Sequence, residues 1–252
     1  MISIGLELEA IYNRDVVTPP AVQNYHHGTY EEEANWKAET DGSLNVLTAD
    51  RTAYGEHAST LELISKRLVG RDGMLTALNE VKEVFCHNKP LKDCFRFNKT
   101  CGAHIHFSIL GRVKQRTHIK LFESMRQEFF DRINQSELRP AVKKKIITHY
   151  GREYSQMLTK EEYLNPNRRS EFNFLSEASE KGMEWRSVNL HGVNTWTELY
   201  TVYNIAYDCI ENLERRVRKY NIIENIKLEQ NEISSLRKKL NYTERETIKV
   251  KL

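Results

Sequence analysis

The first ten residues, MISIGLELEA (1–10), decide which fold to expect. Apolar residues alternate there with small or polar ones: Ile2, Ile4, Leu6 and Leu8 against Ser3, Gly5, Glu7 and Glu9. A period of two is typical of a β-strand, which we expect over residues 2–11. Because side chains at i and i+2 share a face, both carboxylates point the same way. Two like charges this close destabilise a sheet unless a cation neutralises them, so the stretch predicts a cation as well as a strand.

Strands are expected mainly in the first half of the chain and helices in the second. The expected strands are 34–39, 60–65, 94–98, 103–110 and 183–190, with a loop over 12–34. The expected helices are 70–85, most of 114–163, 195 to about 219, and about 222–247. This grouping indicates an α+β fold rather than a doubly wound sheet.

The chain divides by composition into a domain over 1–210 and a charged helical extension over 211–252. The extension contains more basic than acidic residues and few that must be buried together. It is compatible with an arm, with an oligomer contact, or with a peripheral helix.

Composition excludes several classes of protein. The 252 residues are 29% charged and 39% hydrophobic, as in an ordinary globular protein, and the net charge of +3 gives no indication of nucleic-acid binding. No apolar stretch approaches the roughly 20 residues that span a membrane. Acidic residues stand where a signal peptide would have its apolar core, so we expect a cytoplasmic protein.

The cysteines agree with that compartment. Four are present and none forms a CxxC pair, which favours reduced thiols. A zinc site is an alternative for three of them with one histidine, although their spacing fits no standard pattern: Cys86, His87, Cys94 and Cys101.

Four groups of polar residues on or beside expected strands are candidates for chemistry. They are Glu7 with Glu9, Asp41 of a DGSL turn with Glu62, His104 with His106, and Glu184 with Arg186. Each of the i, i+2 pairs shares one face of its strand. Taken singly, each has an ordinary structural explanation, such as a solvated edge or a surface ion pair. If the strands form one sheet, however, that face gathers carboxylates, imidazoles and an arginine.

Carboxylate oxygens dominate this set and thiolates are missing from it, which favours magnesium or manganese over zinc. Magnesium commonly bridges protein carboxylates and nucleotide phosphates. No GxxxxGK[ST] phosphate loop and no kinase glycine-rich loop occurs in the sequence. A nucleotide would therefore be held mainly through its metal ions.

Five blocks in this order resemble the amidoligase family, the carboxylate–amine ligases of the glutamine synthetase and glutamate–cysteine ligase superfamily. They are IGLELEA, WKAETDGSL, TLELISKRLVGRDGMLTALNEV, CGAHIHFS and MEWRSVNLHGVNTWTELY, and they span most of residues 2–210. The resemblance implies a twisted, mostly antiparallel sheet whose concave face binds magnesium ions and ATP, with helices packed outside.

The resemblance also implies a role for each candidate residue. The implied metal ligands are Glu7, Glu9, Glu62, His104 and Glu184. Nucleotide contacts are implied for His106, Arg186 and Arg169, of which both arginines would also act in catalysis, Arg186 on the transferring phosphate. Asp41 resembles the aspartate of the family's DGS turn on the amine side. Two departures are Lys66, where relatives have proline, and the RRSEFNF block (168–174), which lacks their tyrosine.

The implied activity is an ATP- and magnesium-dependent ligation of small-molecule or peptide carboxylates and amines through an acyl phosphate. Three other interpretations remain open from the sequence. His-x-His on a strand also occurs in metal-dependent amidohydrolase barrels, which need eight βα units, and in cupins, which place a glutamate soon after the pair. The fold would also serve as a non-catalytic interaction module.

Overall fold

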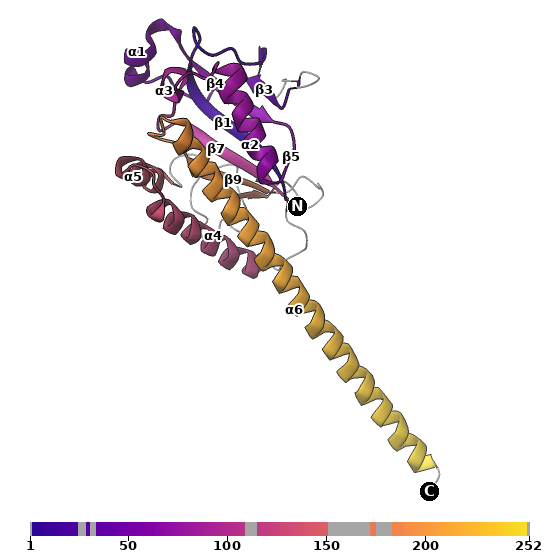
Figure 1. The fold of residues 1–252 in the computed structure, drawn as a ribbon. Helices are drawn as coiled ribbons and strands as arrows, with labels where there is room; N and C mark the ends of the chain where they lie inside the picture. Colours follow the sequence, from indigo (N-terminus) through magenta and orange to yellow (C-terminus); the bar gives the residue numbers. More distant parts are fainter. Residues whose placement is uncertain are drawn as a thin grey trace.

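The structure, a computed structural model, describes residues 2–24, 29–30, 34–108, 115–150, 172–174 and 183–250 (Figure 1). Its strands are β1 (Ser3–Asn13), β2 (Val22–Gln23), β3 (Trp36–Glu39), β4 (Ala58–Ser65), β5 (Leu68–Val69), β6 (Phe95–Arg96), β7 (Gly102–Phe107), β8 (Phe172–Phe174) and β9 (Met183–Asn189). Its helices are α1 (Thr48–Tyr54), α2 (Gly70–Glu80), α3 (Leu91–Cys94), α4 (Gln115–Gln135), α5 (Pro140–His149) and α6 (Trp196–Val250), with short turns η1 (Gly55–His57) and η2 (Val81–Phe85).

All described strands belong to one open sheet built around β1. The order along the sheet is β2-β3-β4-β1-β7-β9-β8, while β5 and β6 pair with the two ends of β1. Only the β2–β3 pair among these described strands is parallel. The expected α+β class with a mostly antiparallel sheet is therefore confirmed.

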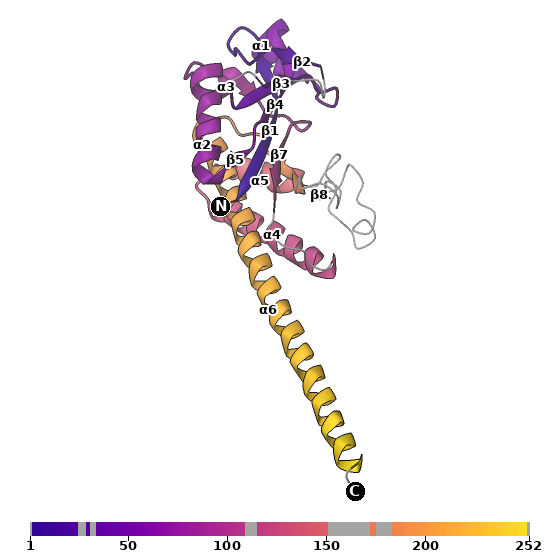
Figure 2. The ribbon, with the colours of Figure 1, turned by 90° about the vertical axis from the view of Figure 1, so that its right-hand side faces the viewer.

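The alternation in β1 separates an apolar face of the sheet from a polar one. Leu6 and Leu8 are fully buried, as are Ile105 of β7 and Trp185 of β9, which the register places on the same face. Helices α2, α4 and α6 pack on this face, and Figure 2 shows α2 and α6 lying to one side of β1 and β7. The ring of Phe129 in α4 meets Trp185 edge-on at 5.1 Å.

Ion pairs join the covering helices to one another. Asp208 of α6 accepts hydrogen bonds from Arg71 of α2 and from Arg132 of α4, the latter at 3.0 Å. At the start of α6, Glu198 accepts two hydrogen bonds from Arg139, which directly precedes α5. These contacts fix the helical layer, so the sheet above it is a rigid support for side chains on its polar face.

The structure corrects several expected boundaries. Strand β1 continues to Asn13 and β2 lies within the expected loop over 12–34. The expected strand over 94–98 is reduced to Phe95–Arg96, because Asn98 turns its side chain to Asp50 of α1, and β7 ends at Phe107. The helix expected over 70–85 changes to π-helical geometry at Val81. Helix α1 was not expected from the sequence, and residues 151–163 lie outside the described part.

The largest correction concerns the C-terminal region. Instead of two helices, one to about residue 219 and another from about 222, α6 runs unbroken from Trp196 to Val250 (Figure 1). Residues 219–222 contain neither proline nor glycine, so nothing in the sequence ends the first helix there. The division at residue 210 falls inside this helix and stays a prediction.

In the described residues, no helix is both long and apolar enough to cross a membrane. The described strands form an open sheet and pair mostly antiparallel, so this sheet differs from the closed parallel barrel that an amidohydrolase requires.

Candidate functional site

The register of the sheet aligns the predicted residues across neighbouring strands. Glu9 of β1 stands opposite Glu62 of β4, and Glu7 stands opposite His104 of β7. One step further along β7, His106 stands opposite Glu184 of β9. Residues paired in this way lie side by side on the same face. Four strands thus bring the acidic and imidazole side chains to the polar face of the sheet, opposite the helices.

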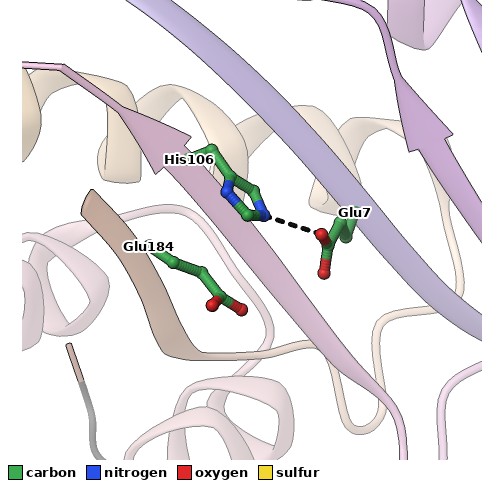
Figure 3. Close-up of side chains that lie close together, drawn as sticks. All are labelled: Glu7, His106 and Glu184. Carbon is green, nitrogen blue, oxygen red and sulfur yellow. Dashed lines mark hydrogen bonds and ion pairs between the residues drawn. The ribbon is translucent and has the colours of Figure 1, made fainter. Parts of the chain in front are cut away.

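Glu7 is held by both histidines of β7. Its Oε2 lies 2.8 Å from Nδ1 of His104, and its Oε1 lies 2.7 Å from Nε2 of His106. Burial raises the pKa of Glu7, but the hydrogen bonds from His104 and His106 outweigh this and hold the pKa well below its usual range. Figure 3 shows the carboxylates of Glu7 and Glu184 on either side of the His106 strand. Glu7 is therefore ionised at neutral pH.

His104 lies between three carboxylates. Besides Glu7, its Nε2 is 3.6 Å from Glu9 Oε1 and its Nδ1 is 3.4 Å from Glu184 Oε1. Burial lowers the pKa of His104, yet the surrounding charges of Glu9, Glu7 and Glu184 raise it to about 9. The imidazole is therefore a cation at neutral pH and partly balances the acidic cluster.

Glu9 is fixed by the backbone of β7. The amide N–H of Gly102 donates to Glu9 Oε2 at 2.6 Å. A Cβ at position 102 would lie 3.0 Å from this oxygen and 3.1 Å from His104 Nε2, so a glycine allows the close approach. Burial, and then the charge of Asp41, raise the pKa of Glu9 against the opposing effects of His104 and Gly102.

Glu62 has the least compensated carboxylate of the cluster. Its side chain is 5% exposed, and its Oε2 is buried without a hydrogen-bond partner in the described part of the chain. Burial, followed by the charges of Glu7, Glu9 and Asp41, raises the pKa of Glu62 to about 8. A buried oxygen of this kind is costly unless a donor or a cation approaches it.

Two groups of three side chains are spaced to bind a metal ion. One is Glu9, Asp41 and Glu62, and the other is Glu7, His106 and Glu184; the ligand atoms within each group lie within 4.8 Å of one another. Two oxygens bound to one magnesium ion at about 2.1 Å are at most about 4.2 Å apart, so only small side-chain movements are needed. The all-carboxylate group suits a hard cation such as magnesium. The orphaned Glu62 oxygen fits this assignment.

Membership of these two groups differs from the predicted roles for three residues. His106 and Asp41, predicted to contact the nucleotide and the amine, each complete a metal-binding group. His104, predicted as a metal ligand, joins neither group and instead links them through Glu7 and Glu9. Glu7, Glu9, Glu62 and Glu184, predicted as metal ligands, each belong to one of the two groups, and their roles stay predictions.

Of the two arginines with predicted roles, Arg186 lies in the described part of the chain and Arg169 does not. Arg186 lies beside the cluster, with its Nε 3.2 Å from Glu184 Oε1. Arg169 lies outside the described residues, as does the side chain of Asn173, whose backbone pairs with Glu184.

A cavity of about 310 Å³ adjoins the Glu7–His106 side of the cluster. Its lining combines polar residues such as Ser3, Arg67 and Ser108 with apolar residues such as Ile4, Ile64 and Phe107. Gly5 stands opposite His106, so it leaves the imidazole open to this space. The cavity is large enough for a small molecule, and Arg67 and His106 both line it.

The sequence analysis did not identify one further acidic residue on the polar face, Glu39 of β3. Glu39 of β3 stands opposite Glu62, is fully buried, and forms an ion pair with Lys37. The signal was the Lys37-x-Glu39 spacing in an expected strand. The metal-binding groups of the described residues contain no cysteine, so the alternative zinc set of Cys86, His87, Cys94 and Cys101 is not assembled.

Comparison with protein-family models finds no match for this chain. Comparison with curated proteins finds none either.

Proposed function

We propose that this chain is an ATP-dependent carboxylate–amine ligase that uses magnesium. One observation carries the proposal: acidic side chains from β1, β4 and β9 and the DGSL turn converge with two histidines on one face of the sheet, in two groups spaced for divalent cations. The order of the sequence blocks that resemble amidoligases supports the same activity. The mostly antiparallel sheet with helices on its other face supports the proposal at the level of fold class.

The proposed residues have two roles: some would bind the cations, and Arg186 would contact the phosphoryl group. Glu9, Asp41 and Glu62 would hold one ion, and Glu7, His106 and Glu184 another. Bound divalent ions would supply Lewis-acid stabilisation of phosphate oxygens. Arg186 would neutralise charge on the phosphoryl group as it is transferred.

The reaction would proceed in two balanced steps. A substrate carboxylate oxygen attacks the γ-phosphorus of ATP, which forms an acyl phosphate and releases ADP. A neutral amine then attacks the acyl carbon, the C–N bond forms, and inorganic phosphate leaves. Asp41, which is partly exposed, would accept the proton lost by the amine through one carboxylate oxygen while the other oxygen contacts the ion.

Phosphate release from ATP tests the proposal with the purified full chain. A panel of carboxylates and amines is supplied with magnesium, and hydroxylamine is included as a general amine that converts an acyl phosphate to a hydroxamate. We expect ATP turnover that needs magnesium and a carboxylate. Glu62→Gln and Glu184→Gln should each abolish it, while Glu56→Gln, at an exposed position, should not.

Full turnover in Glu62→Gln or Glu184→Gln would remove that residue from the site. Substrate hydrolysis that proceeds without ATP would favour the metal-dependent hydrolase. Failure of the folded chain to bind either magnesium or ATP would leave the non-catalytic module as the correct interpretation.

A further inference from the structure

Helix α6 extends well beyond the body that it helps to cover. Val217 is its last buried residue among the described side chains, and every side chain from Leu228 to Ser235 is exposed. The 33 residues from 218 to 250 add about 50 Å of helix, and Figures 1 and 2 show this part projecting away from the sheet. An isolated helix gains little stability without packing.

The sequence of the projecting part carries a heptad pattern. With Ile226, Ile233 and Leu240 at position a, the d positions are Ile222, Glu229 and Leu236. Five of these six positions are apolar, whereas the pattern ends after Leu240. Ile226 and Ile233 at a with Leu236 at d match the arrangement that favours two parallel strands. Ile222 and Glu229 at d and Leu240 at a depart from it. The apolar seam is short and contains one glutamate, so we expect an association that depends on protein concentration.

The flanking charges complement a second copy of the same helix. In a parallel pair, position g of one helix faces position e of the next heptad in its partner. Glu232 at g then faces Arg237 of the partner subunit, and Lys239 at g faces Glu244 of the partner subunit. By symmetry each pairing occurs twice. In an antiparallel pair centred on the same seam, position e faces position e, and Arg237 meets the uncharged Gln230 of the partner subunit instead.

We propose that the projecting part of α6, over about 222–244, pairs with the same segment of a second copy of this chain as a parallel two-stranded coiled coil. The self-complementary charges identify the occupant as another copy rather than an unrelated helix. This pairing places both bodies at the same end of the coil. It is independent of the proposed ligase activity, because no residue of the acidic cluster takes part.

Sedimentation equilibrium of the full chain over a range of concentrations tests the pairing. We expect a dimer that becomes monomeric on Ile233→Asp, at a seam position that is 51% exposed in the single chain. The matched control is Leu228→Asp, which changes an equally apolar residue, 64% exposed, at position c outside the seam. This variant should stay dimeric.

Charge exchange tests the orientation. Arg237→Glu should raise the dimer dissociation constant about tenfold, since two attractive pairs become repulsive. The double variant Glu232→Lys with Arg237→Glu should restore the affinity of the unmodified chain. A chain that is monomeric at its highest soluble concentration, or a dimer equally affected by Ile233→Asp and Leu228→Asp, would overturn the coiled coil. A dimer unaffected by Arg237→Glu would overturn the parallel arrangement.

Discussion

Replacement of Glu62 by glutamine should stabilise the protein in magnesium-free buffer, although it removes a residue from the centre of the site. Glu62 is buried beside Glu9 and Asp41, and Oε2 of its carboxylate accepts no hydrogen bond from the described residues. Ionisation of this group is therefore unfavourable in the folded chain. Glutamine resembles the protonated form in shape and carries no charge.

The size of the effect follows from the pKa of Glu62, which burial and then the neighbouring acids raise from 4.5 to about 8. A carboxyl group with a raised pKa in the folded state binds its proton more tightly than the unfolded chain does. Its contribution to stability is therefore greatest below pH 4.5 and declines as the pH rises towards 8. By pH 7 the free energy of unfolding should have fallen by about 3 kcal/mol.

Urea unfolding at a series of pH values, with a chelator present, measures this difference. The gap in free energy of unfolding between Glu62→Gln and the unmodified chain should grow by about 3 kcal/mol from pH 4.5 to pH 7. Glu56→Gln, at an exposed position, should show no such growth. A gap that stays constant across this range would mean that Glu62 titrates normally, and would refute the electrostatic account of the cluster.

Two further predictions concern the neighbours of Glu62. Gly102→Ala should weaken magnesium binding about tenfold in calorimetric titration, because the added Cβ would press on the Glu9 carboxylate and the His104 ring. The pKa of His104 is raised to about 9 against burial, by Glu9, Glu7 and Glu184, so the stability that its charge provides is present below about pH 6.5 and is lost as the pH rises through about 9. His104→Gln should therefore remove the part of the decline in unfolding free energy that is due to His104 over that interval, while the part due to Glu62 remains, as measured by urea titration.

The strands could be predicted from sequence because their alternation reflects a sheet with one apolar face and one polar face. Leu6 and Leu8 belong to the hydrophobic core, whereas Glu7 and Glu9 belong to the polar face, so the residues of this part of β1 alternate in polarity. Strand ends and short helices were less predictable. They depend on single side-chain contacts, such as that of Asn98 with Asp50, which no local pattern encodes.

The sequence predicts which residues share the polar face, but it does not predict which of them are neighbours across the strands. The i, i+2 rule assigns each pair of residues to one face, but it does not say which residue stands opposite which. That depends on register, which turned out to align Glu39 with Glu62 and His106 with Glu184. His104 and His106 lie two residues apart on β7, yet their surroundings differ. His104 is enclosed by three carboxylates, whereas His106 is open to a cavity.

The position of His104 explains how such an acidic face can fold before any cation binds. Like charges on adjacent strands oppose pairing of those strands, and Glu9 of β1 stands opposite Glu62 of β4. The imidazolium of His104 on β7 attracts both Glu7 and Glu9 of β1, so these two strands gain a favourable electrostatic contact beside the Glu9–Glu62 pair. Glu62 on β4 has no such partner and remains protonated instead. Without a divalent ion, His104 therefore balances the charges of Glu7 and Glu9, and a bound proton neutralises Glu62. Only this proton must leave for Glu62 to act as an ionised ligand.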